Sequence, residues 1–123
     1  MDRTWNDRQP IYRQIRDRVV AMILEGALTE GDALPSVRTV AAELRVNPLT
    51  VLKAYQELAD EHIVETRRGL GMFVSAGGRA RLQAAERSYF LAEQWPAVLA
   101  TIKRLGLTLD ELLSDAKPHA KRR

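Results

Sequence analysis

The sequence predicts a mainly α-helical protein that contains one small β-hairpin and continues into a short helical appendage. Apolar residues recur at the three- and four-residue spacing of amphipathic helices over most of the chain. Two short segments of alternating polarity flank a glycine-containing loop at residues 67–71, which is typical of a hairpin. With 123 residues, 46% of them hydrophobic, the chain is long enough for one small domain and an appendage.

The composition excludes several classes of protein. There is no cysteine, which excludes disulfides, thiolate chemistry and cysteine-ligated metal sites. The two histidines, His62 and His119, have no ligand spacing around them, so we expect no metal and no cofactor. The first ten residues lack an apolar segment, and no apolar run approaches the roughly 20 residues that span a bilayer. We therefore expect a soluble cytoplasmic protein with no signal peptide and no membrane partner.

The net charge of +3 is unevenly distributed along the chain. Residues 1–78 hold 10 basic and 11 acidic side chains, for a charge of −1, whereas residues 79–123 hold 9 and 5, for +4. Positive charge attracts nucleic acid, but the first part of this chain is not basic as a whole. Any binding of nucleic acid there must depend on where single positive charges lie.

The first helix is predicted from Pro10 to Glu25, after a loose N-terminal arm of residues 1–9. Trp5 of the arm is expected to pack against the body or a partner chain. Gly26 follows the helix, whose apolar residues recur every four positions, namely Ile11, Ile15, Val19 and Ile23. We expect the charged face to be solvated, with a phosphate contact from one arginine as the alternative; its members are Arg13, Arg16, Asp17 and Arg18.

A second, shorter helix is predicted after the turn-rich connector of residues 27–33. Ser36 is a good N-cap for it, because its hydroxyl can accept a hydrogen bond from a free backbone N–H. Its buried stripe is expected to be Val37, Val40, Ala41 and Leu44. Arg38 and Thr39 face outward at its start, where unpaired backbone N–H groups also attract phosphate.

A third helix is predicted after a turn at Arg45–Val46. Asn47 is a strong N-cap, and Pro48 fits the first helical position because no hydrogen bond is lost there. The core-facing residues are expected to be Val51, Ala54, Tyr55 and Leu58. The open face consists of Leu49, Thr50, Lys53, Gln56 and Asp60. Its methyl groups come first and its polar groups later, which suits a helix that contacts bases in the DNA major groove. An ordinary solvated helix face explains the same pattern equally well.

A hairpin is predicted from the alternating segments Ile63–Thr66 and Met72–Ser75. Its loop combines charge with tight turning, through Arg67, Arg68, Gly69 and Gly71. We interpret the loop as a contact to DNA phosphate or the minor groove rather than a solvated tip, because it directly follows a helix pair. A helix pair followed by a hairpin is the layout of a winged helix-turn-helix, here residues 10–76.

Residues 77–116 are predicted to form a helical dimerisation region, which begins after a short hinge at Ala76–Gly78 and is interrupted at Pro96. Two or three short helices cannot bury this much apolar surface among themselves. Pairing with a second copy is the commonest solution, so we expect a homodimer. The expected dimer contacts are Tyr89, Phe90, Trp95, Val98, Leu99, Ile102, Leu105, Leu109 and Leu112. Residues 117–123 are predicted to be a disordered basic tail.

These segments resemble the GntR-type bacterial transcription regulators. The matching motifs are Pro10-Ile-Tyr-Arg-Gln-Ile, Leu34-Pro-Ser-Val-Arg, Val46-Asn-Pro-x-Thr-Val-x-Lys-Ala-Tyr-Gln-Glu-Leu58 and Arg68-Gly-Leu-Gly-Met-Phe-Val74. The third motif, with a short helical tail, is similar to the YtrA-type subfamily. The resemblance implies a dimeric repressor that binds a palindromic operator through a recognition helix and a wing and lacks a large ligand-binding domain. Members of the subfamily commonly regulate neighbouring genes for ABC transporters.

Carried over by position, the resemblance implies DNA contacts for Arg38, Asn47, Thr50, Lys53 and Gly71, with Arg67 and Arg68 as additions. The residues themselves add Thr39, Leu49 and Gly69 to this candidate DNA-binding set. Two positions depart from the family's pattern. Leu49 stands where the subfamily usually has a polar residue, often Asn, so one base or phosphate contact is lost or becomes apolar. His62 stands where the family usually has Gly, which should only strain the turn.

Two other classes of function compete with this hypothesis. A winged-helix module that binds protein rather than DNA is the alternative, and the charge of −1 over residues 1–78 favours it. An enzyme is not expected, because no nucleophile, metal cluster or phosphate loop stands out. Asp60 and Glu61 are adjacent on a helix rather than opposed across a cleft. A small-molecule effector, if one acts, needs a small pocket in the helical tail or at the domain junction.

Overall fold

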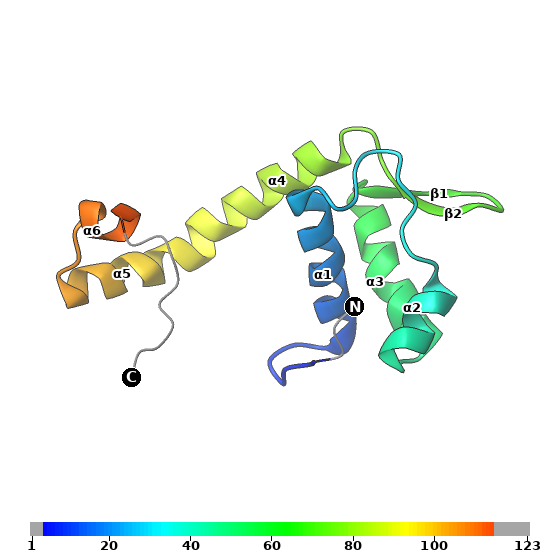
Figure 1. The fold of residues 1–123 in the computed structure, drawn as a ribbon, viewed down its shortest axis with the longest axis horizontal. Coiled ribbons are helices and arrows are strands. Elements are labelled where there is room, and N and C mark those ends of the chain that lie inside the picture. The colour runs from blue at the N-terminus through cyan, green and yellow to red at the C-terminus, as the bar shows by residue number, and fades with distance from the viewer. Residues whose placement is uncertain (1–3, 115–123) are drawn as a thin grey trace. The chain divides into compact units, whose positions relative to one another are not determined.

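The computed structural model describes residues 4–114. The predictions for residues 115–116 and for the basic tail 117–123 lie outside the described residues. The described chain is mostly helical with one antiparallel hairpin, which confirms the predicted fold class (Figure 1). It forms two compact units, Met1–Ala85 and Glu86–Arg123. Among residues 4–114, no helix combines the length and the apolar character needed to cross a membrane.

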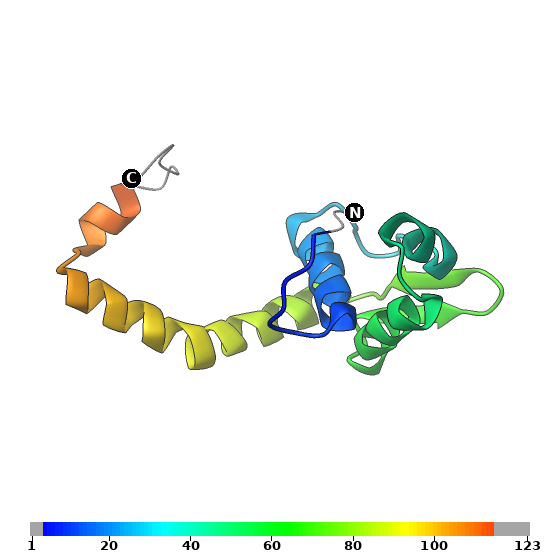
Figure 2. The same cartoon turned by 90° about the horizontal axis from the view of Figure 1, so that it is seen from below.

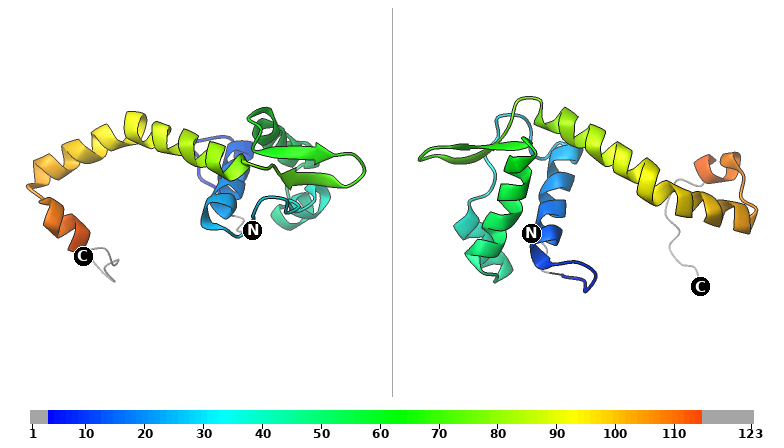
Figure 3. Two further views of the ribbon diagram at one scale, coloured as in Figure 1. Left: turned by 90° about the horizontal axis from the view of Figure 1, so that it is seen from above. Right: turned by 180° about the vertical axis from the view of Figure 1, so that it is seen from behind.

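Three helices build the first unit: α1 (Ile11–Glu25), α2 (Val37–Leu44) and α3 (Pro48–Asp60). Helices α1 and α3 lie side by side, and α2 packs against α3 (Figures 1 and 3). The apolar stripes predicted from helical spacing meet in one core, whose most deeply buried members include Ile15, Val19, Ile23, Val40, Leu44, Val51, Tyr55 and Leu58. Their burial fixes which face of α3 remains open.

The predicted N-caps are confirmed. The Ser36 hydroxyl accepts a hydrogen bond from the backbone N–H of Thr39 at 3.1 Å. The Asn47 side chain accepts one from the backbone N–H of Leu49 at 2.8 Å, and Pro48 occupies the first helical position. These caps satisfy backbone donors that a helix start otherwise leaves unpaired. They therefore fix where both helices of the pair begin.

The hairpin consists of β1 (Val64–Arg67) and β2 (Gly71–Val74), paired in antiparallel register with Val64 opposite Val74. The connector before α2, predicted only as a turn, runs alongside β2 and pairs with it through an isolated antiparallel bridge. Leu34 donates its N–H to the carbonyl of Met72 at 2.8 Å, and Asp32 accepts from the N–H of Val74 at 2.9 Å. The free end of the hairpin extends beyond the helices of this unit (Figure 2).

The N-terminal arm is not loose over its described residues, which corrects the sequence prediction. The Gln14 side chain is buried and donates to the carbonyls of Asn6 and Gln9 at 2.9 and 2.8 Å, while the N–H of Asn6 donates back to it at 3.0 Å. The Arg18 guanidinium lies 4.3 Å from the centre of the Trp5 ring. Trp5 thus packs against the body of its own chain.

The charged face of α1 is partly solvated, with Asp17 exposed, but Arg16 departs from the prediction because it is buried toward α3. Arg16 is only 7% exposed and donates to both carboxylate oxygens of Glu61, at 2.9 and 3.1 Å. Arg13 adds an ion pair to Glu57 at 3.0 Å. A buried guanidinium needs such partners, because an unpaired charge is costly in a low-dielectric interior. The two arginines therefore join α1 to the C-terminal end of α3.

Helix α4 (Gly78–Tyr89) begins at a closely packed glycine. A side-chain carbon on buried Gly78 would lie 2.4 Å from the carbonyl oxygen of Ile63, so only glycine fits there. Leu82, one turn later, is fully buried in the core of the first unit. Arg79 donates to the carbonyls of Ile23 and Leu24, at 3.2 and 2.6 Å, and so caps the end of α1. The first turns of α4 belong to the winged unit.

The second unit contains the end of α4, a π-helical segment η1 (Phe90–Gln94), α5 (Trp95–Leu105) and α6 (Leu109–Ser114). Pro96 does not end the helix. The backbone N–H of Trp95 bonds to the carbonyl of Phe90, five residues back, so the wider π turn accommodates the proline. The helix then ends at Gly106, which adopts a left-handed conformation with φ 68°.

The buried hydroxyl of Tyr55 links α3 to the segment before α2 and makes the stability of the fold depend on pH. Its ring is 1% exposed, and its hydroxyl donates to the carbonyl of Pro35 at 2.7 Å. Burial raises the pKa of Tyr55 to about 12, from the ordinary 10 of a tyrosine. The unfolded chain therefore loses this proton from pH 10 upward, while the folded chain keeps it until about pH 12.

Stability supplied by Tyr55 is thus complete below pH 10 and is lost as the pH rises toward 12. Replacing Tyr55 by phenylalanine is expected to lower the free energy of unfolding by about 1 kcal/mol at neutral pH, through the lost hydrogen bond. Urea unfolding at several pH values checks this. The stability of the wild type should fall more steeply than that of Tyr55→Phe between pH 10 and 12; parallel curves would contradict the assignment.

Candidate nucleic-acid interface

The turn between α2 and α3 places the start of α3 at the surface. Arg45 ends α2 in a left-handed conformation with φ 57°, and the N–H of Val46 bonds back to the carbonyl of Ala41 at 3.1 Å. The sequence did not predict a positive φ at Arg45. Asn47 and Pro48 then begin α3 at once, so two short helices meet across a tight turn.

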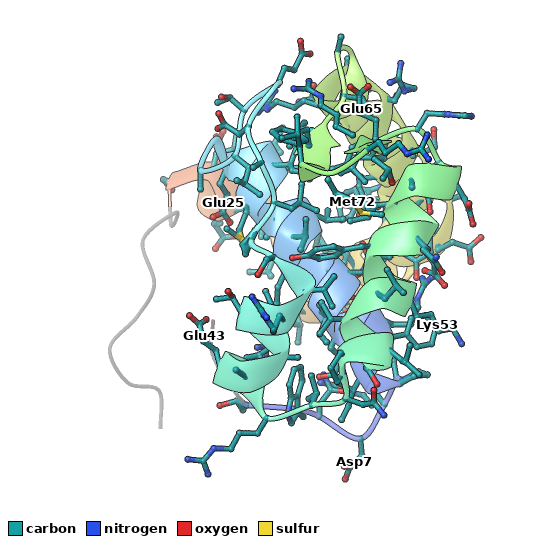
Figure 4. The ribbon with its side chains drawn as sticks, turned by 90° about the vertical axis from the view of Figure 1, so that its right-hand side faces the viewer. Asp7, Glu25, Glu43, Lys53, Glu65 and Met72 are labelled. Carbon is teal, nitrogen blue, oxygen red and sulfur yellow. The ribbon has the colours of Figure 1, made fainter. Side chains whose placement is uncertain are left out.

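The open face of α3 is a stripe of exposed residues at helical spacing, namely Leu49, Lys53, Gln56 and Asp60. Thr50, also in the candidate set, is half-buried. Figure 4 looks onto α2, α3 and the hairpin, and Lys53 projects from α3 on the side away from α2. Its ammonium lies 4.1 Å from the centre of the Tyr12 ring of α1, a cation–π contact that limits where this charge can reach. Tyr12 is therefore a residue of this surface that sequence reasoning missed.

The two ends of α3 differ in charge. Its C-terminal half carries Glu57 and Asp60, and Glu61 follows it, whereas no acidic residue lies in its first turn. Arg13 and Arg16 pair with Glu57 and Glu61, and Asp60 is exposed. The helix dipole adds partial positive charge at the N-terminus. DNA phosphates are thus attracted to the start of α3, which is where Leu49 and Thr50 lie, and Asp60 adds negative charge at its other end.

The start of α2 exposes a second positive charge. Arg38 and Thr39 are both exposed, and the Thr39 hydroxyl accepts from the Ser36 hydroxyl at 2.8 Å. Within residues 4–114, the Arg38 side chain has no hydrogen-bond or ion-pair partner. It is therefore available to a ligand, beside backbone N–H groups that the helix itself leaves unpaired.

The two arginines of the hairpin, Arg67 and Arg68, have different surroundings. Arg67 lies 4.2 Å above the Phe73 ring and donates to Glu65 at 3.2 Å, so it braces the hairpin. Arg68 is exposed and has no partner among the described residues. Gly69 and Gly71, with φ 76° and 110°, make the turn that presents it.

Arg68 is consequently the stronger candidate for a phosphate contact in the hairpin. Arg68→Ala is expected to weaken binding to every DNA sequence about equally. It should also lower the slope of log affinity against log salt concentration by about 0.9 for each DNA-bound winged helix-turn-helix, called a head below. The matched variant Arg67→Ala, which removes a charge already paired with Glu65, should change the slope less. Anisotropy titrations at several salt concentrations measure both slopes, and a larger change for Arg67→Ala would contradict this division of roles.

The residues predicted to dimerise all lie from the end of α4 onward. Phe90 and Trp95 contact each other, with ring centres 6.3 Å apart, while Trp95, Leu99 and Ile102 are half-buried. The others are exposed, namely Tyr89, Phe90, Val98, Leu105, Leu109 and Leu112. This second unit buries none of its described residues fully, so its apolar surface faces outward in a single chain.

The described residues 4–114 contain no group of three acidic or histidine side chains that could hold a metal ion. His62, exposed after α3, adopts a positive φ of 63°, and Arg81 donates to its carbonyl at 2.6 and 3.1 Å. His62 therefore holds a turn position with a left-handed backbone, where the family usually has Gly.

Two helices across a tight turn, with a basic hairpin beside them, define the winged helix-turn-helix class of DNA-binding proteins. Comparisons with known proteins place the chain within that class. Residues 11–74, more than half of the chain, match the family model for bacterial regulatory proteins of the gntR family. The chain therefore belongs to the GntR family and is a DNA-binding transcriptional regulator.

Its similarity extends over the helical tail to small regulators of the YtrA type. The chain is 36% identical over 117 residues to the HTH-type transcriptional regulator YhcF of Bacillus subtilis, covering 95% of each chain. It is 37% identical over 103 residues to the HTH-type transcriptional repressor YtrA of the same organism, covering 84% of this chain and 78% of that one. The YtrA-type assignment made from the motifs is confirmed.

Solved structures agree with this assignment. A GntR family transcriptional regulator from Listeria monocytogenes superposes with a TM-score of 0.71 and 30% identity, covering 89% of this chain and 95% of that one. YtrA from Sulfolobus acidocaldarius, a GntR-family transcription factor, gives a TM-score of 0.57 and 34% identity, covering 74% and 97%.

Proposed function

We propose that this chain is a homodimeric repressor that binds a palindromic operator through two winged heads. The observation that supports this proposal most is that the two units expose different kinds of side chain. The first exposes Arg38, the start of α3 and Arg68, whereas the second exposes mainly apolar side chains. A charge of −1 over residues 1–78 makes a single head a weak DNA ligand.

Two linked heads overcome that weakness. Binding of the first head places the second at a high effective concentration near its half-site, which raises the overall affinity by about 10²–10⁴. A two-fold dimer requires a two-fold operator, with half-sites one or more helical turns apart. The repressor named YtrA, similar over most of this chain, supports repression as the outcome, and control of transporter genes is the proposed target.

The candidate DNA contacts keep different roles in this proposal. Arg38, Lys53 and Arg68 supply charge, and Asn47, Gly69 and Gly71 shape the backbone that approaches DNA. Thr39, Leu49 and Thr50 lie at the starts of the two helices. Arg67 braces the hairpin and lies beside the DNA rather than carrying the main phosphate contact.

Selection of bound duplexes from a random pool tests this function directly. The full chain should enrich a two-fold symmetric sequence whose half-sites have one constant spacing. Enrichment of a single unrepeated half-site would contradict the dimer, and no enrichment at low salt would contradict sequence-specific binding.

A further inference from the structure

Leu49 has no structural role that explains its position. It exposes 69% of its surface at the start of α3, and among the large apolar side chains of residues 4–85 only Leu49 and Leu70 are more than half exposed. Its backbone N–H is held by the Asn47 cap, so the side chain projects from a fixed first turn. A leucine exposed in this way contributes nothing to the core, so its apolar surface is free to contact a ligand.

The surroundings of Leu49 place it where DNA would approach. The first turn of α3 carries no acidic residue and has the positive end of the helix dipole, so it is the part of the helix that DNA phosphates favour. Lys53, one turn further on the same stripe, is drawn to the Tyr12 ring. Leu49 is therefore the exposed side chain of α3 closest to its leading end after Pro48, the first helical residue.

The chemistry of leucine limits what it can recognise. Its side chain neither donates nor accepts a hydrogen bond, so it cannot read the polar edges of bases. The apolar group that a base pair presents in the major groove is the C5-methyl of thymine. We propose that Leu49 is a specificity-determining residue that reads the C5-methyl of one thymine in each operator half-site. This inference rests on the proposed function and adds a base preference to it.

Replacing that thymine by deoxyuridine removes the methyl and keeps every hydrogen-bonding group of the pair. Burial of one methyl-sized group corresponds to about a fourfold change in affinity per half-site, or about 15-fold for a palindrome changed in both halves. The test uses the full chain and the operator recovered by selection, in a panel of duplexes with each thymine replaced symmetrically. Anisotropy titrations then give the ratio of affinities for thymine and deoxyuridine at each position.

The wild type should lose about 15-fold at one thymine position, and Leu49→Ala should bind the two duplexes of that pair equally. Leu70→Ala, which truncates the other highly exposed leucine, is the matched control and should keep the wild-type ratio. Because Leu49 is exposed, Leu49→Ala should also unfold at the wild-type temperature.

Three outcomes would overturn the inference. Equal wild-type affinity for every thymine and deoxyuridine pair would show that no methyl is read. A methyl effect that persists in Leu49→Ala would assign it to another residue, and one lost in Leu70→Ala but not in Leu49→Ala would assign it to the hairpin. Failure of the selection itself is separate, because it removes the proposed function before any thymine is tested and this inference falls with it.

Discussion

Replacing Arg38 by alanine is expected to weaken specific operator binding strongly while leaving the fold and the oligomeric state unchanged. Arg38 is exposed at the start of α2 and has no partner within residues 4–114, so its removal disturbs no internal contact. Loss of an arginine contact to DNA costs about 1–3 kcal/mol per head, which doubles in a dimer. The dissociation constant should therefore rise by roughly 30-fold or more, measured by anisotropy with a labelled operator duplex.

The matched control for this experiment is Arg87→Ala, which removes one positive charge from the second unit. Arg87 is also exposed, so any effect of net charge alone should be the same in the two variants. We expect Arg87→Ala to bind within about threefold of the wild type, because exposed charges far from the DNA are screened by salt. Retained operator affinity in Arg38→Ala would show that Arg38 does not contact DNA.

Introducing two glutamates at Val98 and Leu105 is expected to convert the proposed dimer into monomers. Both side chains are exposed in the single chain and lie two turns apart on one face of α5. In a dimer contact they would bury unpaired charge, which a largely apolar interface does not tolerate. Light scattering should report the mass of one chain, and operator affinity should fall by about 10²–10⁴ as the linkage between heads is lost.

Ala100→Glu is the control for the dimer test, because Ala100 lies on the opposite face of α5 and is exposed. This variant should remain a dimer and bind the operator as the wild type does. The opposite pattern, with dissociation by Ala100→Glu alone, would move the interface to the other face of α5. A Val98→Glu, Leu105→Glu variant that remains dimeric would place the interface outside this helix.

Local features of the fold were predictable from the sequence because each rests on a few neighbouring residues. Ser36 and Asn47 were recognised as caps since their side chains bond to N–H groups two or three positions later. The buried stripe Val51, Tyr55 and Leu58 follows from helical periodicity alone. The exposure of Leu49 follows from the same stripe, as the residue left on the other side.

Contacts between distant segments were not predictable in this way. Arg16 and Glu61 are 45 positions apart, so neither the burial of Arg16 nor its partner can be inferred from spacing along one helix. The Tyr12–Lys53 contact and the bonds between the connector and β2 have the same origin. The close approach of the Ile63 backbone to Gly78, which requires the lack of a side chain, likewise joins residues 15 positions apart.

The central claim is that two copies of the winged head, linked through the helical tails, read one operator. Light scattering of the protein in complex with the selected operator duplex tests it most directly. We expect a complex of two chains on one duplex. At protein concentrations below the dissociation constant of a single winged helix-turn-helix, no stable complex of one chain should form. A stable complex of one chain on the full operator would contradict it.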